Sequence, residues 1–277
     1  KEKYLSQLLN GEIVIGLGMT EPNAGSAVTD LTTKAVEDGE GFRVSGSKVF
    51  TSNSPDADIF LIYVRYHEGV NGIGSVLMDT SMEGFSKGKS SKYTNGEEWC
   101  ALYFDNVFIP KENVLLGPGG FKKQIAGFNA ERIGNTARSL AVGEFAYNLA
   151  REYALTREQF GKKICEFQGI QWKFSDMKIQ IEAGRLLLYR AAINADKGFP
   201  SSKETSIAKA FCNKAGFDIC NEAMQVMGGT GYSQETLVEY CFRKSRGWQI
   251  AGGSTEMMKN RIAEDIFERR FSQRPNK

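Results

Sequence analysis

Phe104-Asp-Asn-Val-Phe-Ile-Pro110 is the stretch at which the hydrophobic pattern of this 277-residue chain changes. Before it, short apolar runs alternate with Gly- and Ser-rich connections, which is typical of β-strands joined by turns. After it, apolar residues recur every three or four positions, which indicates amphipathic helices. We therefore expect an α+β fold, with an antiparallel β-sandwich or barrel domain over residues 1–112 and a four-helix bundle domain over residues 113–277.

The first half contains six runs with strand character, and no segment between them has the period of a helix. Glu37-Asp-Gly-Glu-Gly41 separates two of these runs and predicts a hairpin. A parallel sheet with crossover helices is therefore disfavoured. The predicted strands cover residues 13–19, 32–36, 42–50, 59–66, 73–78 and 99–108.

The second half predicts four helices. One apolar stripe runs from Ile133 to Tyr153 and a second from Ile170 to Ala192. Ser201 and Glu204 have the spacing of a capping box and open a third helix that runs to Met227. A fourth helix is expected over residues 254–270.

Composition and charge exclude several classes of protein. Apolar residues make up 41% and charged residues 25%, so the chain is not disordered, and a net charge of +2 does not favour nucleic acid as a partner. The apolar runs are too short to span a membrane. The five cysteines form no C-x-x-C pair and His67 is the single histidine, so a metal site and a Ser-His-Asp mechanism are both poorly supported. A reducing cytosol is the simpler interpretation.

Four segments combine glycine with polar residues where core packing does not require them. Each also has a plain structural explanation: a turn, a strand end, a helix C-cap or a helix N-cap. Exposed N–H groups and hydroxyls at such places could also hold a phosphate or a heteroaromatic edge. The segments are Met19-Thr-Glu-Pro-Asn-Ala-Gly-Ser26, Lys48-Val-Phe-Thr-Ser-Asn53, Gln225-Val-Met-Gly-Gly-Thr-Gly231 and Gln249-Ile-Ala-Gly-Gly-Ser-Thr-Glu256.

The order and separation of these segments resemble the acyl-CoA dehydrogenase family of flavoproteins. Gly46-Ser-Lys-Val-Phe-Thr-Ser-Asn53 and Phe104–Pro110 are similar to the family's middle β domain, and Arg157-Glu-Gln-Phe-Gly161 to its C-terminal helical domain. The resemblance covers essentially the whole chain. It implies a chain that lacks the family's N-terminal helical domain.

The resemblance implies FAD and an acyl-CoA thioester. A carboxylate removes the α-proton while a hydride passes between the β carbon and flavin N5, and hydrogen bonds stabilise the enolate oxygen. The family's usual base falls at Gly252, which can supply only a backbone N–H. Glu131 lies at the alternative position used by isovaleryl-CoA and long-chain acyl-CoA dehydrogenases, so we expect Glu131 to be the base. Without the family context, Glu131 would be a solvent-facing helical carboxylate.

Further roles carry over from the resemblance residue by residue. Arg132 is similar to the arginine beside the base, and Ser26, Asn129 and Arg132 are expected near the substrate. Part of the FAD site is expected to come from a neighbouring subunit, which implies a dimer or a dimer of dimers, that is, a homotetramer. The expected FAD-binding residues are Leu17, Met19, Thr20, Gly25, Ser26, Phe50, Ser52, Arg157, Gln159, Phe160, Gln225, Gly229, Ser254 and Glu256, of which Arg157, Gln159, Phe160, Gln225 and Gly229 would serve the neighbouring subunit.

The substrate and the direction of reaction are less defined by the sequence. Ala251-Gly-Gly-Ser-Thr-Glu-Met257 and Phe128-Asn-Ala-Glu-Arg132 most resemble the crotonobetainyl-CoA reductase branch, which acts on carnitine-derived thioesters. Dehydrogenation of short or branched acyl-CoA is the close competitor, within fatty acid metabolism. Either direction implies an electron-transferring flavoprotein as partner, in the bacterial cytoplasm or a mitochondrial matrix. A non-catalytic interaction or scaffold subunit remains the alternative.

Overall fold

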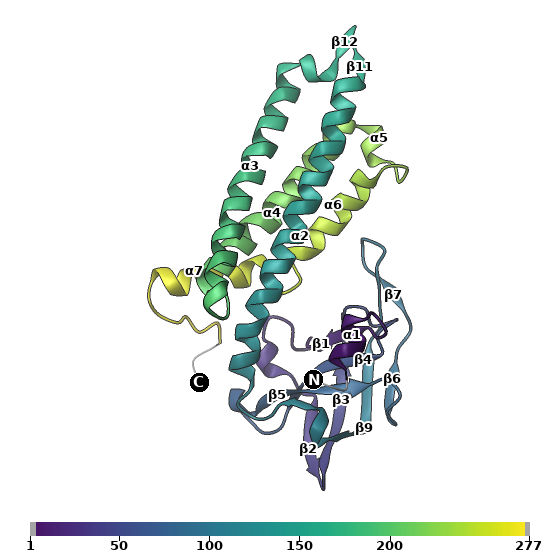
Figure 1. Ribbon diagram of the computed structural model, residues 1–277, viewed down its shortest axis with the longest axis vertical. Coiled ribbons are helices and arrows are strands. Elements are labelled where there is room, and N and C mark those ends of the chain that lie inside the picture. Colours follow the sequence, from purple (N-terminus) through teal and green to yellow (C-terminus); the bar gives the residue numbers. More distant parts are fainter. Residues whose placement is uncertain (1–3, 275–277) are drawn as a thin grey trace. The chain divides into compact units, whose positions relative to one another are not determined.

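The computed structural model describes residues 4–274, which divide into two compact units, Lys1–Ile125 and Ala126–Lys277. The first unit is built on a β-sheet, and the second is helical (Figure 1). The predicted fold class, a sheet domain followed by a helical domain, is confirmed.

The first unit contains an eight-stranded sheet with the order β10-β5-β4-β2-β3-β9-β6, and β1 pairs with β4 beside this path. Strands β7 and β8 form a separate two-stranded ribbon. The bounds are α1 (Leu5–Leu9), β1 (Ile15–Gly18), β2 (Lys34–Asp38), β3 (Gly41–Lys48), β4 (Ile59–Arg65), β5 (Ile73–Asp79), β6 (Phe85–Lys87), β7 (Ser91–Lys92), β8 (Glu98–Trp99), β9 (Leu102–Pro110) and β10 (Val114–Leu116).

The predicted hairpin is present, since β2 and β3 pair antiparallel from Lys34–Ser45 to Asp38–Gly41. Two pairs depart from the antiparallel expectation: β1 runs parallel to β4 over Ile15–Gly18, and β2 is parallel to β4 where Lys34 pairs with Arg65. A crossover helix is not needed for the β1–β4 pairing because the β2–β3 hairpin itself fills the connection between the two strands. The sheet is therefore mixed, although most of its pairs are antiparallel.

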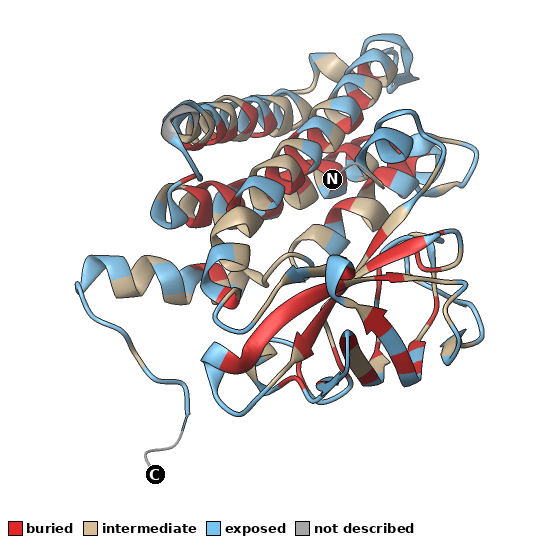
Figure 2. Cartoon of the chain, turned by 60° about the horizontal axis from the view of Figure 1, so that its bottom comes forward, coloured by how far each residue is buried: buried red, intermediate tan, exposed pale blue. Residues whose placement is uncertain are grey.

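The core of the sheet unit lies along β4, β5 and β9. Five of the seven residues of β4 are buried, which explains why this strand is a continuous apolar run rather than an alternating one. Figure 2 shows buried residues along the strands of the sheet. Strand β9 alternates in burial, so it has one covered face. His67 lies just beyond β4, is exposed, and approaches the Glu68 carbonyl through Nδ1 at 3.0 Å.

The longest helices of the helical unit run side by side, and shorter helices pack against them (Figure 1). Helix α4 is central, with neighbours α3, α6 and α7. The predicted cap is confirmed: the Ser201 hydroxyl accepts a hydrogen bond from the Glu204 N–H at 3.5 Å. The bounds are α2 (Phe121–Thr156, which begins in the first unit), β11 (Glu158–Gln159), β12 (Lys162–Lys163), α3 (Gln168–Ile193), α4 (Ser202–Met227), α5 (Gly229–Tyr232), α6 (Leu237–Trp248) and α7 (Thr255–Ile266).

Two predictions about the helices are wrong in detail. Helix α6 was not predicted; it is 12 residues long, and its buried residues are Val238, Glu239, Cys241 and Ser245. The last helix ends at Ile266 rather than at Arg270. All five cysteines are free thiols. Within residues 4–274 no helix is both long and apolar enough to cross a membrane.

Candidate active site

The predicted site residues fall into three groups, one in the sheet unit and two in the helical unit. Each group is described within its own unit. Over residues 4–274, three or more His, Cys, Asp or Glu side chains do not gather anywhere in a way that could hold a metal ion.

In the sheet unit, the structure brings together the turn after β1 and the segment after β3. The Val49 N–H donates to the Thr20 carbonyl at 2.9 Å, and Lys48 Nζ donates to the Met19 carbonyl at 3.3 Å. A Cβ on Gly16 would come within 3.0 Å of the Ser52 carbonyl, so β1 also lies against this segment. The expected FAD residues Leu17, Met19, Thr20, Phe50 and Ser52 therefore belong to one continuous region.

A buried ion pair holds this region and was not predicted. Lys48 Nζ lies 2.8 Å from Glu21 Oε1, and both side chains are almost fully buried. The Glu21 carboxylate also accepts hydrogen bonds from the N–H and hydroxyl of both Thr32 and Thr33. Burial alone would raise the pKa of Glu21, but Lys48 and these hydrogen bonds lower it to about 2. The sequence signal was a lysine at a buried strand position, at the end of β3.

Phe50 offers an exposed aromatic surface. Its backbone is left-handed (φ 54°) and its side chain is 57% exposed, although its ring lies 4.6 Å from that of Trp99 and 6.5 Å from that of Tyr93. Such strain in a non-glycine residue often marks a functional position. Ser52 is exposed beside it, and in the described part of the chain the buried Thr51 Oγ1 has no hydrogen-bond partner.

In the helical unit, Glu131 and Gly252 adjoin each other. A Cβ on Gly252 would lie 3.2 Å from Glu131 Oε2, 3.2 Å from Asn135 Nδ2 and 3.6 Å from Lys209 Cε. The carboxylate of Glu131 thus occupies the space into which a side chain at residue 252 would project. Among residues 4–274 the Gly252 N–H has no hydrogen-bond partner, so it is a free donor.

Glu131 is exposed on one side and enclosed on the other. Burial against the surrounding protein raises its pKa, and the charges of Lys209, Arg132 and Arg138 together with a hydrogen bond to Asn135 act in the opposite direction. A carboxylate that is accessible and has a raised pKa is suited to accept a proton from a substrate.

Arg132 connects the helix of Glu131 to the Gly252 loop. Its Nε donates to the Gly252 carbonyl at 2.9 Å, and its guanidinium donates to Asn129 Oδ1 at 2.9 Å. Asn129 is buried and donates in turn to the Pro200 carbonyl at 3.3 Å. These bonds fix Gly252 relative to α2, and they engage Arg132 and Asn129 within the helical unit.

Lys209 and Asn213 on α4 complete this cluster and were not predicted. Lys209 Nζ donates to the Trp248 carbonyl at 2.8 Å, and Asn213 Nδ2 donates to the same oxygen at 2.7 Å. Ser254 and Glu256 follow at the start of α7, where the Ser254 hydroxyl accepts from the Met257 N–H at 3.4 Å and Glu256 is exposed. The sequence signal was a lysine on the buried stripe of α4, between Thr205 and Cys212.

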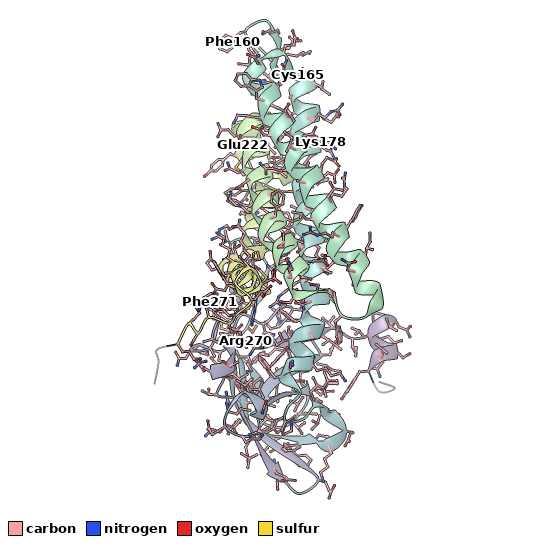
Figure 3. The ribbon with its side chains drawn as sticks, turned by 90° about the vertical axis from the view of Figure 1, so that its left-hand side faces the viewer. Phe160, Cys165, Lys178, Glu222, Arg270 and Phe271 are labelled. Carbon is pink, nitrogen blue, oxygen red and sulfur yellow. The ribbon has the colours of Figure 1, made fainter. Side chains whose placement is uncertain are left out.

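The remaining predicted residues lie at the other end of the helical unit. Glu131 is 25 residues before the end of α2, a rise of about 38 Å along the helix axis. Arg157, Gln159 and Phe160 follow that end, and Phe160, labelled in Figure 3, is 94% exposed with a left-handed backbone (φ 54°). The structure therefore does not bring these three residues to Glu131 within one chain.

Gln225 and Gly229 lie at the C-terminal end of α4 and the start of α5, and both are exposed. Gly228 between them is left-handed (φ 58°), which explains the break between the two helices.

An accessible carboxylate beside a free backbone N–H is an arrangement suited to moving a proton next to a carbonyl group. Residues 16–107 match the model of the acyl-CoA dehydrogenase middle domain, and residues 118–267 match that of the acyl-CoA dehydrogenase C-terminal domain. The chain belongs to the acyl-CoA dehydrogenase family.

Several relatives are similar over most of this chain. The short-chain specific acyl-CoA dehydrogenase of Megasphaera elsdenii is 36% identical over 93% of this chain and 69% of its own length. The CarC subunit of the caffeyl-CoA reductase–Etf complex of Acetobacterium woodii is 34% identical over 97% of this chain and 72% of its own length. The crystal structure of butyryl-CoA dehydrogenase from Megasphaera elsdenii superposes with a TM-score of 0.91 at 34% identity, covering 96% of this chain and 71% of that one.

Proposed function

We propose that this chain catalyses the transfer of two hydrogens between an acyl-CoA thioester and its α,β-unsaturated counterpart, with Glu131 as the base. The observation that carries the proposal is the 3.2 Å between Glu131 Oε2 and the Cβ position of Gly252. The carboxylate of Glu131 thus lies in a space that a side chain at position 252 could also reach. Gly252 leaves that space free for Glu131.

The residues of the helical unit supply the proton chemistry. Glu131 takes the α-proton of the thioester in the oxidising direction and returns it in the reducing direction. The free N–H of Gly252 donates to the thioester oxygen, which gains negative charge as the proton leaves. Arg132 holds the Gly252 carbonyl, so that the donor and the base keep their relative positions.

The residues of the sheet unit fit a flavin. The exposed ring of Phe50 suits a planar heteroaromatic system, and the exposed Ser52 hydroxyl lies two residues further on. Gly25 and Ser26 are exposed in the turn after β1, and a Cβ on Gly25 would meet nothing within 4 Å, so the turn is open to a phosphate. FAD, when bound, exchanges the hydride with the β carbon of the substrate.

A second copy of the chain is proposed as the partner of the helical unit. Along α3 the exposed residues Trp172, Ile179, Leu186 and Ile193 recur every seven positions, an apolar stripe about 32 Å long. Arg157, Gln159 and Phe160 would then reach the FAD of the neighbouring subunit. Light scattering after size-exclusion chromatography should give the molar mass of a dimer or tetramer. The variant Leu186→Glu should shift the measured mass towards that of the monomer.

The name of the Megasphaera elsdenii relative supports short acyl chains, and that of the Acetobacterium woodii relative supports an electron-transferring flavoprotein as redox partner. The bacterial cytoplasm is the compartment that we propose. A carnitine-derived thioester is the second candidate substrate, favoured by Ala251-Gly-Gly-Ser-Thr-Glu-Met257. Comparing kcat/KM for butyryl-CoA and crotonobetainyl-CoA distinguishes the two.

The test of the base is Glu131→Gln. After FAD binding has been established by visible absorption, E131Q should retain the flavin spectrum and lose about 10²–10⁴ in turnover. Glu152→Gln, an exposed carboxylate further along the same helix, is the matched control and should leave turnover unchanged. Normal turnover by E131Q would show that another group removes the proton.

Moving the carboxylate sharpens this test. The double variant Glu131→Gly with Gly252→Glu should regain part of the turnover that Glu131→Gly alone loses, because both positions open onto the same space. Recovery will be partial, since Gly252 has φ +70°, where a side chain is strained.

A further inference from the structure

Lys209 is a buried cation that the mechanism above does not use. It lies in the third turn of α4 and is 1% exposed, one of the largest fully buried side chains among the described residues. Its Nζ donates to the Trp248 carbonyl, an uncharged oxygen, at 2.8 Å. A lysine is rarely buried without a carboxylate to compensate its charge, so its position calls for an explanation.

The side chain of Lys209 lies near that of Glu131. Its Cε and Glu131 Oε2 lie 3.6 Å and 3.2 Å from the same point, the Cβ position of Gly252. Trp248 is also four residues before Gly252, so the bond to its carbonyl anchors the loop that carries the free N–H. Lys209 therefore lies close to Glu131 and bonds the residue that precedes the Gly252 loop, from a helix that carries neither Glu131 nor Gly252.

We propose that Lys209 is the positioning residue of this site: its fixed ammonium keeps Glu131 ionised for proton abstraction, and its bond to Trp248 holds the Gly252 loop. The proposal rests on the proposed role of Glu131 as base.

The charge of Lys209 is needed because the surroundings of Glu131 favour its neutral form. Burial raises the pKa of Glu131, and Lys209 contributes the largest opposing charge, ahead of Arg132 and Arg138 on α2. The guanidinium of Arg132 is already engaged by Gly252 and Asn129. The charged groups that act on Lys209 itself are Glu131 and Arg132, and its pKa is lowered to about 8, chiefly by burial.

A purely structural role for Lys209 gives a different expectation. The Trp248 carbonyl already accepts from Asn213 at 2.7 Å, so one donor remains when Lys209 is replaced. If Lys209 only held the loop, removing either donor would have similar effects on Glu131. If Lys209 acts through its charge, only its removal will change the ionisation of Glu131.

The experiment is a ¹³C NMR titration of the Glu131 side-chain carboxyl in the whole chain without substrate, with the resonance assigned by its loss in E131Q. Lys209→Met and Lys209→Gln should each raise the midpoint by roughly 1 pH unit, the smaller end of the effect of a neighbouring charge. Lys209→Arg, which keeps the charge, should stay near the original midpoint. Asn213→Ala, which removes the uncharged donor, should also leave it unchanged.

Two outcomes would overturn the proposal: an unchanged Glu131 midpoint in the neutral variant that folds, or an equal shift in Asn213→Ala. The glutamine variant keeps a donor for Trp248, so it serves if the methionine variant does not fold. The outcome is separate from that for the base itself. Normal turnover by E131Q would contradict the proposed function. If E131Q is inactive but the Glu131 midpoint does not change in the neutral Lys209 variants, only the proposed role of Lys209 is contradicted.

Discussion

Each unit of the molecule contains a glutamate and a buried lysine, and the two pairs are built in opposite ways. In the sheet unit, Glu21 is enclosed and accepts hydrogen bonds from Lys48, Thr32 and Thr33. In the helical unit, Glu131 is open on one side, and Lys209 bonds a carbonyl instead of the carboxylate. The pKa of Glu21 is lowered to about 2, whereas that of Glu131 is raised.

The difference shows what separates a structural carboxylate from a reactive one. A carboxylate whose lone pairs are all used is stable as an anion and has no capacity left for a proton. A carboxylate that is open to solvent on one side, with a cation nearby that does not hydrogen-bond to it, can gain and lose a proton at little cost. What separates the two carboxylates is that Lys48 bonds Glu21 directly, with the two threonines as further donors, whereas Lys209 acts on Glu131 through its charge alone.

The largest expected effect is on stability in the sheet unit. Lys48→Met leaves the Glu21 carboxylate buried without its cation, and breaking such a pair costs about 3–5 kcal/mol. Lys209→Met removes a buried charge whose partner remains accessible to water, so it should cost far less. Urea unfolding of the two variants measures the difference, and equal losses would contradict the comparison.

The two glutamates should respond oppositely to neutralisation. Glu21→Gln should lower the free energy of unfolding at pH 7 by about 3–5 kcal/mol, since it leaves the buried Lys48 ammonium without its anion. Glu131→Gln should not destabilise the chain at pH 7, because its surroundings already favour a neutral group.

The pH dependence of stability follows from the sign of each shift. The pKa of Glu21 falls from 4.5 to about 2 on folding, so its contribution is complete above pH 4.5 and is lost as the pH falls towards 2. The pKa of Glu131 rises on folding, so its contribution is present below 4.5 and is lost as the pH rises. Acid unfolding should therefore be less steep in E21Q than in the unchanged chain, and a steeper curve would contradict this assignment.

Substituting one glycine in each unit should have a smaller effect on the free energy of unfolding. Gly252→Ala should cost about 1–2 kcal/mol, because its φ of +70° is strained for any side chain. The new Cβ would also press on Glu131 Oε2 at 3.2 Å. Gly25→Ala in the sheet unit meets nothing within 4 Å and should be nearly neutral. Thermal unfolding of both variants checks this, and a neutral G252A would mean that the loop adapts easily.

The sequence predicted the elements whose pattern is local. The β2–β3 hairpin, the cap at Ser201 and the end of α4 at Met227 all follow from a few neighbouring residues. The parallel pairing of β1 with β4 could not be predicted this way, because it depends on which strands meet after the hairpin is inserted between them. Helix α6 was missed because it lies between two glycine-rich segments, residues 228–231 and 252–253, and such segments indicate loops in a sequence.

For the site, the resemblance identified Glu131 and Gly252, but local pattern alone would have left Glu131 as a surface carboxylate. Their proximity comes from residues 121 positions apart in the chain. Lys48 and Lys209 were missed for a common reason: a lysine on an apolar face is indistinguishable from an exposed one until its partners are known. Those partners, Glu21 for Lys48 and Trp248 for Lys209, lie 27 and 39 residues away.

The smallest expected effect comes from an ion pair near the surface, and it tests whether burial is what gives the other two pairs their importance. Lys214 and Asp218 form an i,i+4 pair on α4, the helix that also carries Lys209, and the lysine is exposed. Asp218→Asn should change the free energy of unfolding by about 0.3–0.5 kcal/mol. The change should vanish in 1 M salt, because exposed charges are screened within a few ångströms there. Glu21→Gln should keep its effect in the same salt, since its partners are shielded from water. If 1 M salt removed the effects of both substitutions, the Glu21–Lys48 pair would have to be open to solvent. Burial could then not be the property that distinguishes this pair from Glu131 and Lys209.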